Sequence, residues 1–100
     1  MSQHELDLEL EIDLMKPKMY KVILHNDDYS TFDFVIDVLM EVFHKSKEEA
    51  VKLTFQVDQE GFAVVGIYPK EIAQTKVSLV KFMAKEAQYP LLATMEEEWI

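Results

Sequence analysis

The residues of this chain that could do chemistry are mostly carboxylates and histidines. Asp27 and Asp28 are adjacent and could help to bind a hard cation, but a calcium loop needs further oxygen ligands at defined offsets and a turn glycine, which this segment lacks. The three histidines do not form His-Glu-x-x-His or another spacing typical of a zinc site: His4, His25 and His44. No metal centre is therefore expected, and His25 is expected on a surface turn rather than at the rim of a pocket.

The sequence also lacks the usual groups of nucleophilic and phosphate-transferring enzymes. It has no cysteine, and its two glycines, Gly61 and Gly66, come without the Lys-Ser/Thr partner of a phosphate loop. Asp27 and Asp58 would be the carboxylate pair of a small hydrolase, and this alternative stays open although no nucleophile, metal cluster or phosphate loop supports it. We expect no enzymatic activity and no cofactor.

The charge of the chain favours a cationic partner. Its formal net charge is −9, and all ten basic residues are lysines. Nucleic acids and anionic membranes are polyanions, so we expect neither as a partner, whereas an ammonium group suits the charge balance. No apolar run approaches the roughly 20 residues that span a bilayer, and the N-terminus does not have the pattern of a secretory signal. Together with the absence of cysteine, this indicates a cytoplasmic protein.

Hydrophobic periodicity predicts the elements that must position these residues. Residues 19–24 have the composition of a buried strand, and a polar turn follows them at residues 25–29. Ser30 is expected to cap a helix whose apolar side chains recur at helical spacing: Phe32, Val35, Ile36, Leu39, Met40 and Phe43. A capping box at residues 46–49 begins a second helix, and Gly61 is its expected end.

The second half of the chain predicts two more strands and one more helix. Residues 62–68 are β-branched and aromatic, which indicates a strand. Pro69 suits the first turn of a third helix, and Pro90 ends that region before a short strand at residues 91–95. The order β-α-α-β-α-β predicts an α+β two-layer sandwich, with a three-stranded antiparallel sheet and three helices.

Both ends of the chain are expected to lie outside this domain. Residues 5–14 alternate acidic and aliphatic side chains, which is a strand pattern without a turn partner. We therefore expect residues 1–16 to be a flexible acidic N-terminal extension, with an added edge strand as the alternative. Residues 97–100 are expected to be a short tail, which leaves one domain at residues 17–96.

Two segments of the chain form a more specific pattern. The first runs from Met19 to Tyr29, with its Asn-Asp-Asp-Tyr turn, and continues as Phe-Val-Ile-Asp-Val-Leu at residues 34–39. The second runs from Glu71 to Val77 and continues as Tyr-Pro-Leu-Leu-Ala-Thr at residues 89–94. Together they resemble the ClpS family, the adaptors of the ATP-dependent Clp protease. The resemblance implies an N-end-rule adaptor, which binds proteins with destabilising N-terminal residues (Phe, Tyr, Trp, Leu) and delivers them to a Clp AAA+ unfoldase-protease for degradation.

The resemblance also implies a site for a free α-amino group. An ammonium has three N–H donors, and Asn26 and Asp27 supply an amide oxygen and a carboxylate, although both can also simply stabilise the turn. Asp58 stands where many family members have a histidine that contacts the amine, so it is either a third acceptor or an exposed residue at a helix end. The residues that match the family's hydrophobic pocket are Leu24, Ser30, Phe32, Val35, Thr54, Val57 and Leu91.

Two pocket positions depart from the family pattern. Phe32 and Thr54 stand where methionine is common, so the resemblance does not imply an exact preference among N-terminal residues.

The residues that match the family's contact with the N-terminal domain of a ClpA-like Clp unfoldase are Tyr29, Glu71 and Lys76. Taken alone, such exposed charges are usually solvated surface. A ribosome-associated interaction protein is the alternative reading, because a similar α+β domain occurs in the ribosomal stalk protein.

Overall fold

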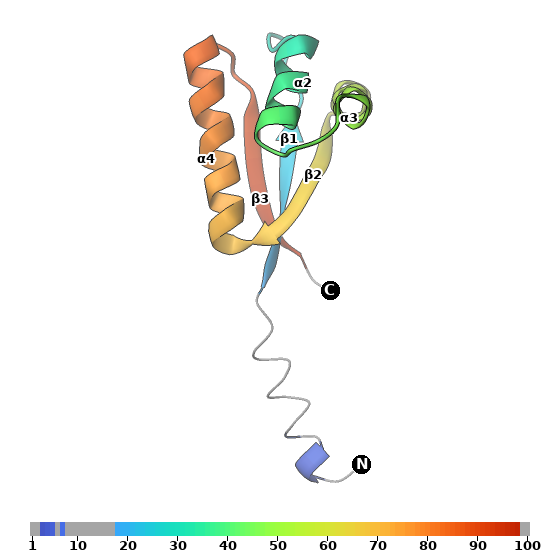
Figure 1. Ribbon diagram of the computed structural model, residues 1–100, viewed down its shortest axis with the longest axis vertical. Helices are drawn as coiled ribbons and strands as arrows, with labels where there is room; N and C mark the ends of the chain where they lie inside the picture. Colours follow the sequence, from blue (N-terminus) through green and yellow to red (C-terminus); the bar gives the residue numbers. More distant parts are fainter. Residues whose placement is uncertain (1–2, 6, 8–17, 99–100) are drawn as a thin grey trace.

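The computed structural model describes residues 3–5, 7 and 18–98, and in it a sheet and helices follow one another in the predicted order (Figure 1). The elements are β1 (Met19–His25), α2 (Phe32–Glu41), α3 (Lys47–Glu60), β2 (Phe62–Pro69), α4 (Lys70–Ala87) and β3 (Leu92–Glu98). The strands form an antiparallel sheet in the order β2-β1-β3. This confirms the predicted α+β class and the order β-α-α-β-α-β.

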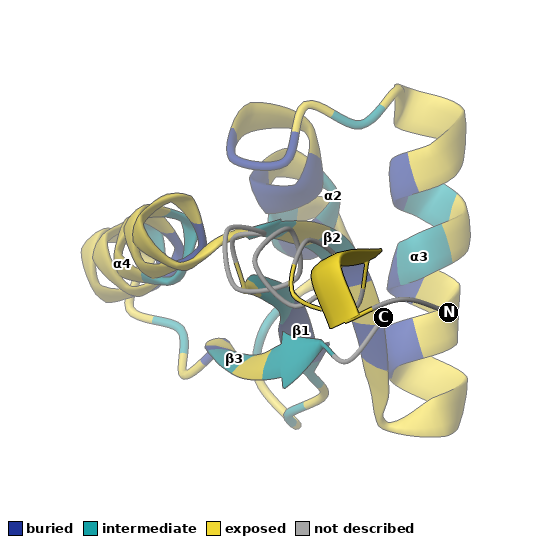
Figure 2. Cartoon of the chain, turned by 90° about the horizontal axis from the view of Figure 1, so that it is seen from below, coloured by how far each residue is buried: buried dark blue, intermediate teal, exposed yellow. Residues whose placement is uncertain are grey.

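The helices cover one face of the sheet. Seen along the strands, α4, α2 and α3 form an arc over it, and the opposite face carries no helix from the described part of the chain (Figure 2). Successive side chains of a strand point to opposite faces, so Val22 and Leu24 of the central strand β1 are completely buried under the helices. The largest fully buried side chains of this core are Leu24, Leu39, Val22, Val38, Val65 and Val80.

A β-bulge interrupts the pairing of β1 with β2. Val22 pairs with Gly66. The next residue of β1, Ile23, pairs with Val64, which leaves Val65 as an extra residue on β2.

The bulge changes which side chains of β2 face the helices. Ala63 and Val65 are buried on the helix side, so strict alternation would place Ile67 there as well. Instead, Ile67 is exposed and Tyr68 packs against the core. The side chain of Tyr68 therefore reaches the helix layer because of the bulge.

Helix α3 begins and ends where the sequence predicts. The Oγ of Ser46 accepts a hydrogen bond from the Glu49 amide at 3.2 Å. Gly61 donates its N–H to the Val57 carbonyl and has φ of 90°, a left-handed conformation that is strained for residues with a Cβ.

Helix α2 begins differently from the prediction. Its N-cap is Thr31, whose Oγ1 accepts a hydrogen bond from the Phe34 amide at 3.1 Å. The predicted cap, Ser30, instead donates its own amide to Asp27 Oδ1 at 2.7 Å. Ser30 is thus held in the turn by Asp27, and the next hydroxyl along the chain caps the helix.

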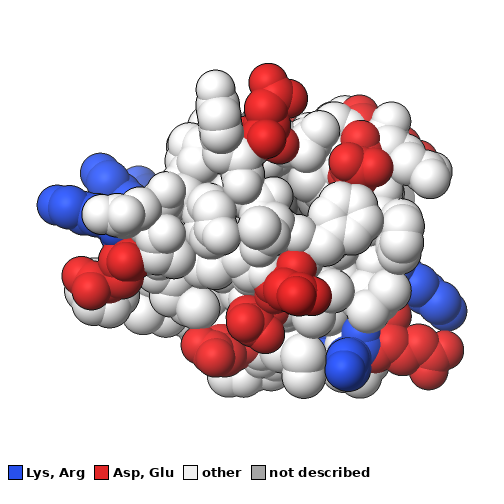
Figure 3. Space-filling model, turned by 90° about the horizontal axis from the view of Figure 1, so that it is seen from above, with Lys and Arg blue, Asp and Glu red and all other residues white. Residues whose placement is uncertain are grey.

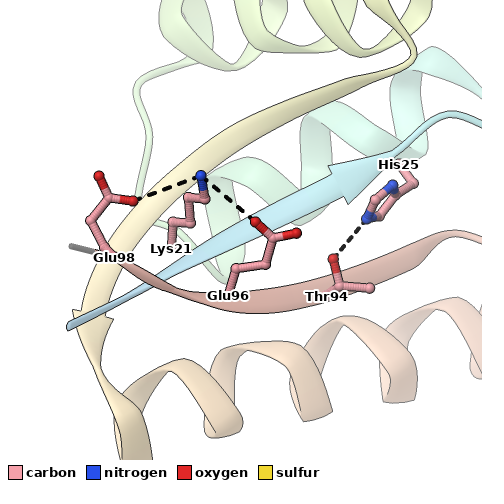
Figure 4. Close-up of polar contacts among 5 residues, drawn as sticks. All are labelled: Lys21, His25, Thr94, Glu96 and Glu98. Atoms are coloured by element: carbon pink, nitrogen blue, oxygen red, sulfur yellow. Dashed lines mark hydrogen bonds and ion pairs between the residues drawn. The ribbon is translucent and has the colours of Figure 1, made fainter. Parts of the chain in front are cut away.

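Strand β3 is longer than the sequence predicts, because it continues to Glu98 instead of ending at residue 95. Lys21 of β1 lies 3.7 Å from Glu96 and 3.8 Å from Glu98, so both carboxylates have a cationic partner across the strands (Figure 4). Lys18 and Glu97 form a further ion pair at 3.7 Å. Opposite charges across strands stabilise a sheet, and residues expected to form an acidic tail belong to β3 through Glu98.

Little of the predicted N-terminal extension is described by the structure. Residues 3–5 and 7 are helical, and most of the alternating segment at residues 5–14 lies outside the described residues. The division into residues 1–16, 17–96 and 97–100 therefore stays a prediction.

Candidate functional site

A cavity of about 310 Å³ lies at the end of the sheet where β1 leads into α2. Its wall is formed by the turn after β1, the start of α2, the C-terminal half of α3 and the residue just before β3. These segments are far apart in the sequence and meet only in the folded chain. Nearly all of the predicted amine-binding and pocket residues line this cavity: Asn26, Asp27, Asp58, Ser30, Phe32, Val35, Thr54, Val57 and Leu91.

One predicted pocket residue lies outside the cavity lining, and two residues that were not predicted there lie in it. Leu24 was expected in the pocket, but it is completely buried in the core and does not line the cavity. His25, expected on a surface turn, does line the cavity, and its Nε2 lies 2.7 Å from Thr94 Oγ1 of β3 (Figure 4). Asp28 also lines the cavity, and the sequence signal for both additions is their position on either side of Asn26 and Asp27.

Two turns are bonded together at the polar end of the cavity. The backbone N–H of Asn26 donates a hydrogen bond of 2.8 Å to the backbone carbonyl of Gly61, the residue that ends α3. The left-handed conformation of Gly61 directs the chain into β2 at this point. The β1–α2 turn is therefore fixed against the end of α3, which carries Val57 and Asp58 of the cavity wall.

The Asp27 carboxylate organises the β1–α2 turn. Its Oδ1 accepts hydrogen bonds from the Tyr29 amide at 2.8 Å and from the Ser30 amide at 2.7 Å. Burial raises the pKa of Asp27, but the hydrogen bonds from the Ser30 and Tyr29 amides outweigh it and hold the pKa below its ordinary value of 3.8. The Ser30 hydroxyl also favours the ionised carboxyl, although its geometry falls short of a hydrogen bond. Asp27 is therefore a carboxylate at neutral pH.

Two oxygens at this end of the cavity are buried without a partner among the described residues. They are the second carboxylate oxygen of Asp27, Oδ2, and the hydroxyl of Ser30. Leaving a buried acceptor unpaired costs about 1–3 kcal/mol, and more for a charged group. A ligand that brings N–H donors would remove this cost, so the site is prepared for a cationic donor.

The other end of the cavity is apolar. Val35, Val57 and Leu91 are buried and form its floor. Thr54 belongs to the same wall, and its hydroxyl donates to the Ala50 carbonyl of its own helix at 2.8 Å, which satisfies this donor within the helix. Phe32 is 40% exposed and is the most accessible of the apolar lining side chains, which places it at the mouth.

The charge around the cavity is negative. Asp27, Asp28 and Asp58 line it, and none of the described lysines does. Figure 3 looks onto this end of the molecule and shows acidic side chains over the middle of the face and lysines at its margins. The described residues contain no group of side chains able to hold a metal ion. Three carboxylates at one cavity make its surroundings electrostatically favourable for cations.

The three residues predicted to contact an unfoldase do not gather in one place. Tyr29 is 75% exposed and follows β1 at the cavity end. Glu71 is exposed in the first turn of α4, two residues after Pro69, which pairs with Met19 at the opposite end of β1. The length of β1 separates these two ends by roughly 20 Å.

Lys76 differs from the solvated lysine that the sequence suggests. It is half-buried, and its Nζ donates a hydrogen bond of 2.7 Å to the carbonyl of Val42, the C-cap of α2. The same ammonium lies 5.5 Å from the centre of the Tyr68 ring. A cation at this position also balances the negative end of the helix dipole.

Comparison with known proteins points to the same family that the two sequence segments resemble. The family described as "ATP-dependent Clp protease adaptor protein ClpS" matches residues 15–94. The ATP-dependent Clp protease adapter protein ClpS of Nautilia profundicola is 54% identical over 90 residues, which are 90% of this chain and 93% of that protein. The protein of the same name from Acetivibrio thermocellus is 50% identical over 90 residues, or 90% and 91% of the two chains.

A solved structure shares the fold. The structure of Agrobacterium tumefaciens ClpS2 bound to L-phenylalaninamide superposes with a TM-score of 0.80 at 40% sequence identity. The match covers 83% of this chain and all of that one, 100%.

The fold and its cavity define a small α+β binding domain with an anionic rim and an apolar floor. The chain belongs to the ClpS family of ATP-dependent Clp protease adaptors. None of the helices in the described ranges is long and apolar enough to cross a bilayer.

Proposed function

We propose that this chain binds the free N-terminus of proteins that begin with a large apolar residue and delivers them to a Clp unfoldase for degradation. The observation that carries the proposal is Asp27 Oδ2, which has no partner in the described part of the chain and lies at the polar end of a cavity whose other end is apolar. An N-terminal residue has both complements, an ammonium and a side chain, joined at one carbon. The cavity of about 310 Å³ is at the small end of ligand pockets and suits a single residue.

The structural relative supports this choice of ligand. Agrobacterium tumefaciens ClpS2 was solved with L-phenylalaninamide, a compound with a free amino group and a phenyl ring. The same two groups match the two ends of the cavity in this chain. Burying a Leu or Phe side chain is worth about 1.5–3 kcal/mol, which favours large apolar side chains over small ones.

The cavity residues then have two roles. Asn26 and Asp27 accept hydrogen bonds from the α-amino group, and Asp58 adds a second negative charge at the rim. The side chain lies among the apolar wall and the small residues beside it: Ser30, Phe32, Val35, Thr54, Val57 and Leu91. Leu24 packs behind this wall and supports it from the core.

Delivery requires a second surface, for the N-terminal domain of the unfoldase. Tyr29 and Glu71 are exposed and are available for that contact. Lys76 already donates a hydrogen bond to the Val42 carbonyl, so its main role is to hold α4 against the end of α2. The adaptor itself catalyses no reaction, needs no cofactor and works in the cytoplasm. Its net charge of −9 disfavours binding to nucleic acid and to anionic membranes.

Fluorescence anisotropy with short labelled peptides tests the amine-binding proposal. Peptides that begin with free Phe or Leu are expected to bind, whereas N-acetyl-Phe and Ala peptides are expected to bind at least tenfold more weakly. Asp27→Ala is expected to weaken binding of the free Phe peptide by roughly 10- to 100-fold, because a charge-assisted hydrogen bond is lost. Equal binding of the free and acetylated peptides would contradict the proposal.

Asp28→Ala is the matched control for this measurement. Asp28 is the adjacent aspartate and lines the same cavity, but it is exposed and its carboxylate holds no backbone amide of the turn. An exposed charge contributes little, so a change below about threefold is expected. If the two variants lost the same affinity, the effect would be one of overall charge and not of the Asp27 oxygen.

A further inference from the structure

The mouth of the cavity is held by an aromatic pair. Phe32 is the first residue of α2, and its ring meets the ring of Phe55 from α3 edge to face, with centroids 5.2 Å apart and an interplanar angle of 87°. Phe32 lines the cavity, whereas Phe55 does not. Phe55 lies instead beside Thr54, on the same helix as Asp58, so it stands outside the wall that those two residues form.

The pair is not an extension of the hydrophobic core. Phe32 is 40% exposed and Phe55 is 48% exposed, while the floor residues Val35 and Val57 are buried. Phe32 follows the N-cap Thr31, whose Oγ1 accepts the Phe34 amide, so the first turn of α2 is anchored and side-chain torsions are the main freedom of the Phe32 ring. Phe55 supplies the ring contact that limits those torsions.

We propose that Phe55 is a positioning residue for ligand selection: it holds the Phe32 ring across the cavity mouth. The inference rests on the proposed function and deepens it. With the amino group at Asn26 and Asp27, the first carbons of the ligand side chain pass the mouth before the rest reaches the floor. A ring held there leaves less room for a side chain that branches at its first carbon, such as Ile, than for an unbranched one, such as Phe.

Removal of Phe55 is expected to relax this selection. Without its partner, the Phe32 ring turns away from the mouth, so branched side chains enter more easily and unbranched ones lose a packed neighbour. An edge-to-face pair contributes about 0.5–1.5 kcal/mol, so the preference for a Phe peptide over an Ile peptide is expected to fall roughly two- to tenfold.

The test measures Kd for two peptides that differ only in an N-terminal Phe or Ile. Phe55→Ala is expected to lower the Phe-over-Ile ratio, and Phe55→Tyr, which keeps the ring, is expected to retain it. In a Phe32→Ala background, Phe55→Ala is expected to change the ratio no further, because Phe55 acts through Phe32. Additive effects in the double variant would overturn the inference, since a merely structural role would persist there.

Phe62→Ala is the control for loss of a surface phenylalanine. Phe62 is 50% exposed, an exposed fraction similar to the 48% of Phe55. It lies on β2, outside the cavity lining. It is expected to leave the ratio unchanged. If the wild type binds both peptides and Phe55→Ala keeps the wild-type ratio, the positioning role of Phe55 is wrong and the proposed function stands. If the wild type binds neither peptide, the proposed function fails and this inference fails with it.

Discussion

The two ends of α2 treat polar groups in opposite ways. At its N-terminal end, Asp27 Oδ2 and the Ser30 hydroxyl are buried with no hydrogen-bond partner among the residues that the structure describes. At its C-terminal end, the Val42 carbonyl accepts a hydrogen bond from Lys76, whose ammonium also lies over the Tyr68 ring. Both ends follow the helix dipole, with carboxylates near the start and a cation at the end.

Under the proposed function, the difference separates an end of α2 that binds the ligand from an end that stabilises the fold. An unpaired buried oxygen costs free energy in the free protein and lowers the cost of binding a donor. A paired cation contributes to stability in the free protein, and it has fewer free N–H donors for a binding partner. We therefore expect substitutions at the Lys76 end to change stability more than peptide affinity, and substitutions at the Asp27 end to change affinity first.

The largest expected effect on stability is at Lys76. Lys76→Ala removes a charged hydrogen bond and leaves the Val42 carbonyl unpaired, so the free energy of unfolding is expected to fall by about 1.5–3 kcal/mol. Urea unfolding measures this change. Lys81→Ala, at an exposed lysine of the same helix, is the control and is expected to change it by less than about 0.5 kcal/mol. A loss of peptide affinity in Lys76→Ala without a loss of stability would contradict the division between the two ends.

A second variant tests how the Tyr68 ring is held beneath Lys76. A Cβ at Gly66 would overlap the ring of Tyr68, so Gly66→Ala forces the ring to move. Overpacking of this kind costs about 1–2 kcal/mol, which chemical unfolding detects. In a Tyr68→Ala background the same substitution is expected to cost clearly less. An equal cost in both backgrounds would mean that the strain arises in the β2 backbone.

The two helix caps should respond differently to the same substitution. Ser46→Ala and Thr31→Ala each remove an N-cap hydrogen bond, so each is expected to lower the free energy of unfolding by about 1 kcal/mol. Only Thr31→Ala also loosens the start of α2 at Phe32, so it alone is expected to weaken peptide binding, by about twofold to fivefold. Weaker binding in Ser46→Ala would show that global stability, and not the local cap, controls the cavity.

The smallest expected effect is a dependence of stability on acid. The pKa of Asp27 in the folded chain is below 3.8, so between these two values the unfolded chain binds more protons than the folded chain. The stability that Asp27 contributes is therefore complete at neutral pH, begins to fall as the pH approaches 3.8, and is lost below the folded pKa. Unfolding of wild type and Asp27→Asn, compared from pH 7 to pH 3, should show the difference between them shrinking at the acidic end. A constant difference would contradict the lowered pKa.

Local patterns in the sequence predicted most of the fold. The N-cap at Ser46 and the stop at Gly61 were predicted correctly because their signals lie within a few residues of the helix ends that they mark. The cap of α2 was assigned to Ser30 and not to Thr31 because both are hydroxyls, and only the hydrogen bond from the Ser30 amide to Asp27 separates them. The end of β3 was missed for a related reason, since the lysine that pairs with Glu96 and Glu98 comes from a distant strand.

The candidate site was predictable where side chains follow one another in the chain. Asn26 and Asp27 belong to one turn, and the structure places both at the cavity. Leu24 is also a predicted pocket residue, but the structure places its side chain in the core and not in the cavity lining. The sequence indicates Phe55 only as a candidate for the apolar side of its helix, because its contact with Phe32 depends on how α2 and α3 pack against each other.

The bulge at Val65 has a consequence for self-association. β2 is an edge strand, and Phe62, Val64 and Ile67 are exposed along it. A long, regular apolar edge is a template for a strand of another chain, and a bulge breaks the hydrogen-bonding repeat that such pairing needs. The irregular edge of β2 is therefore a poorer template for such a strand than a regular edge of the same composition would be.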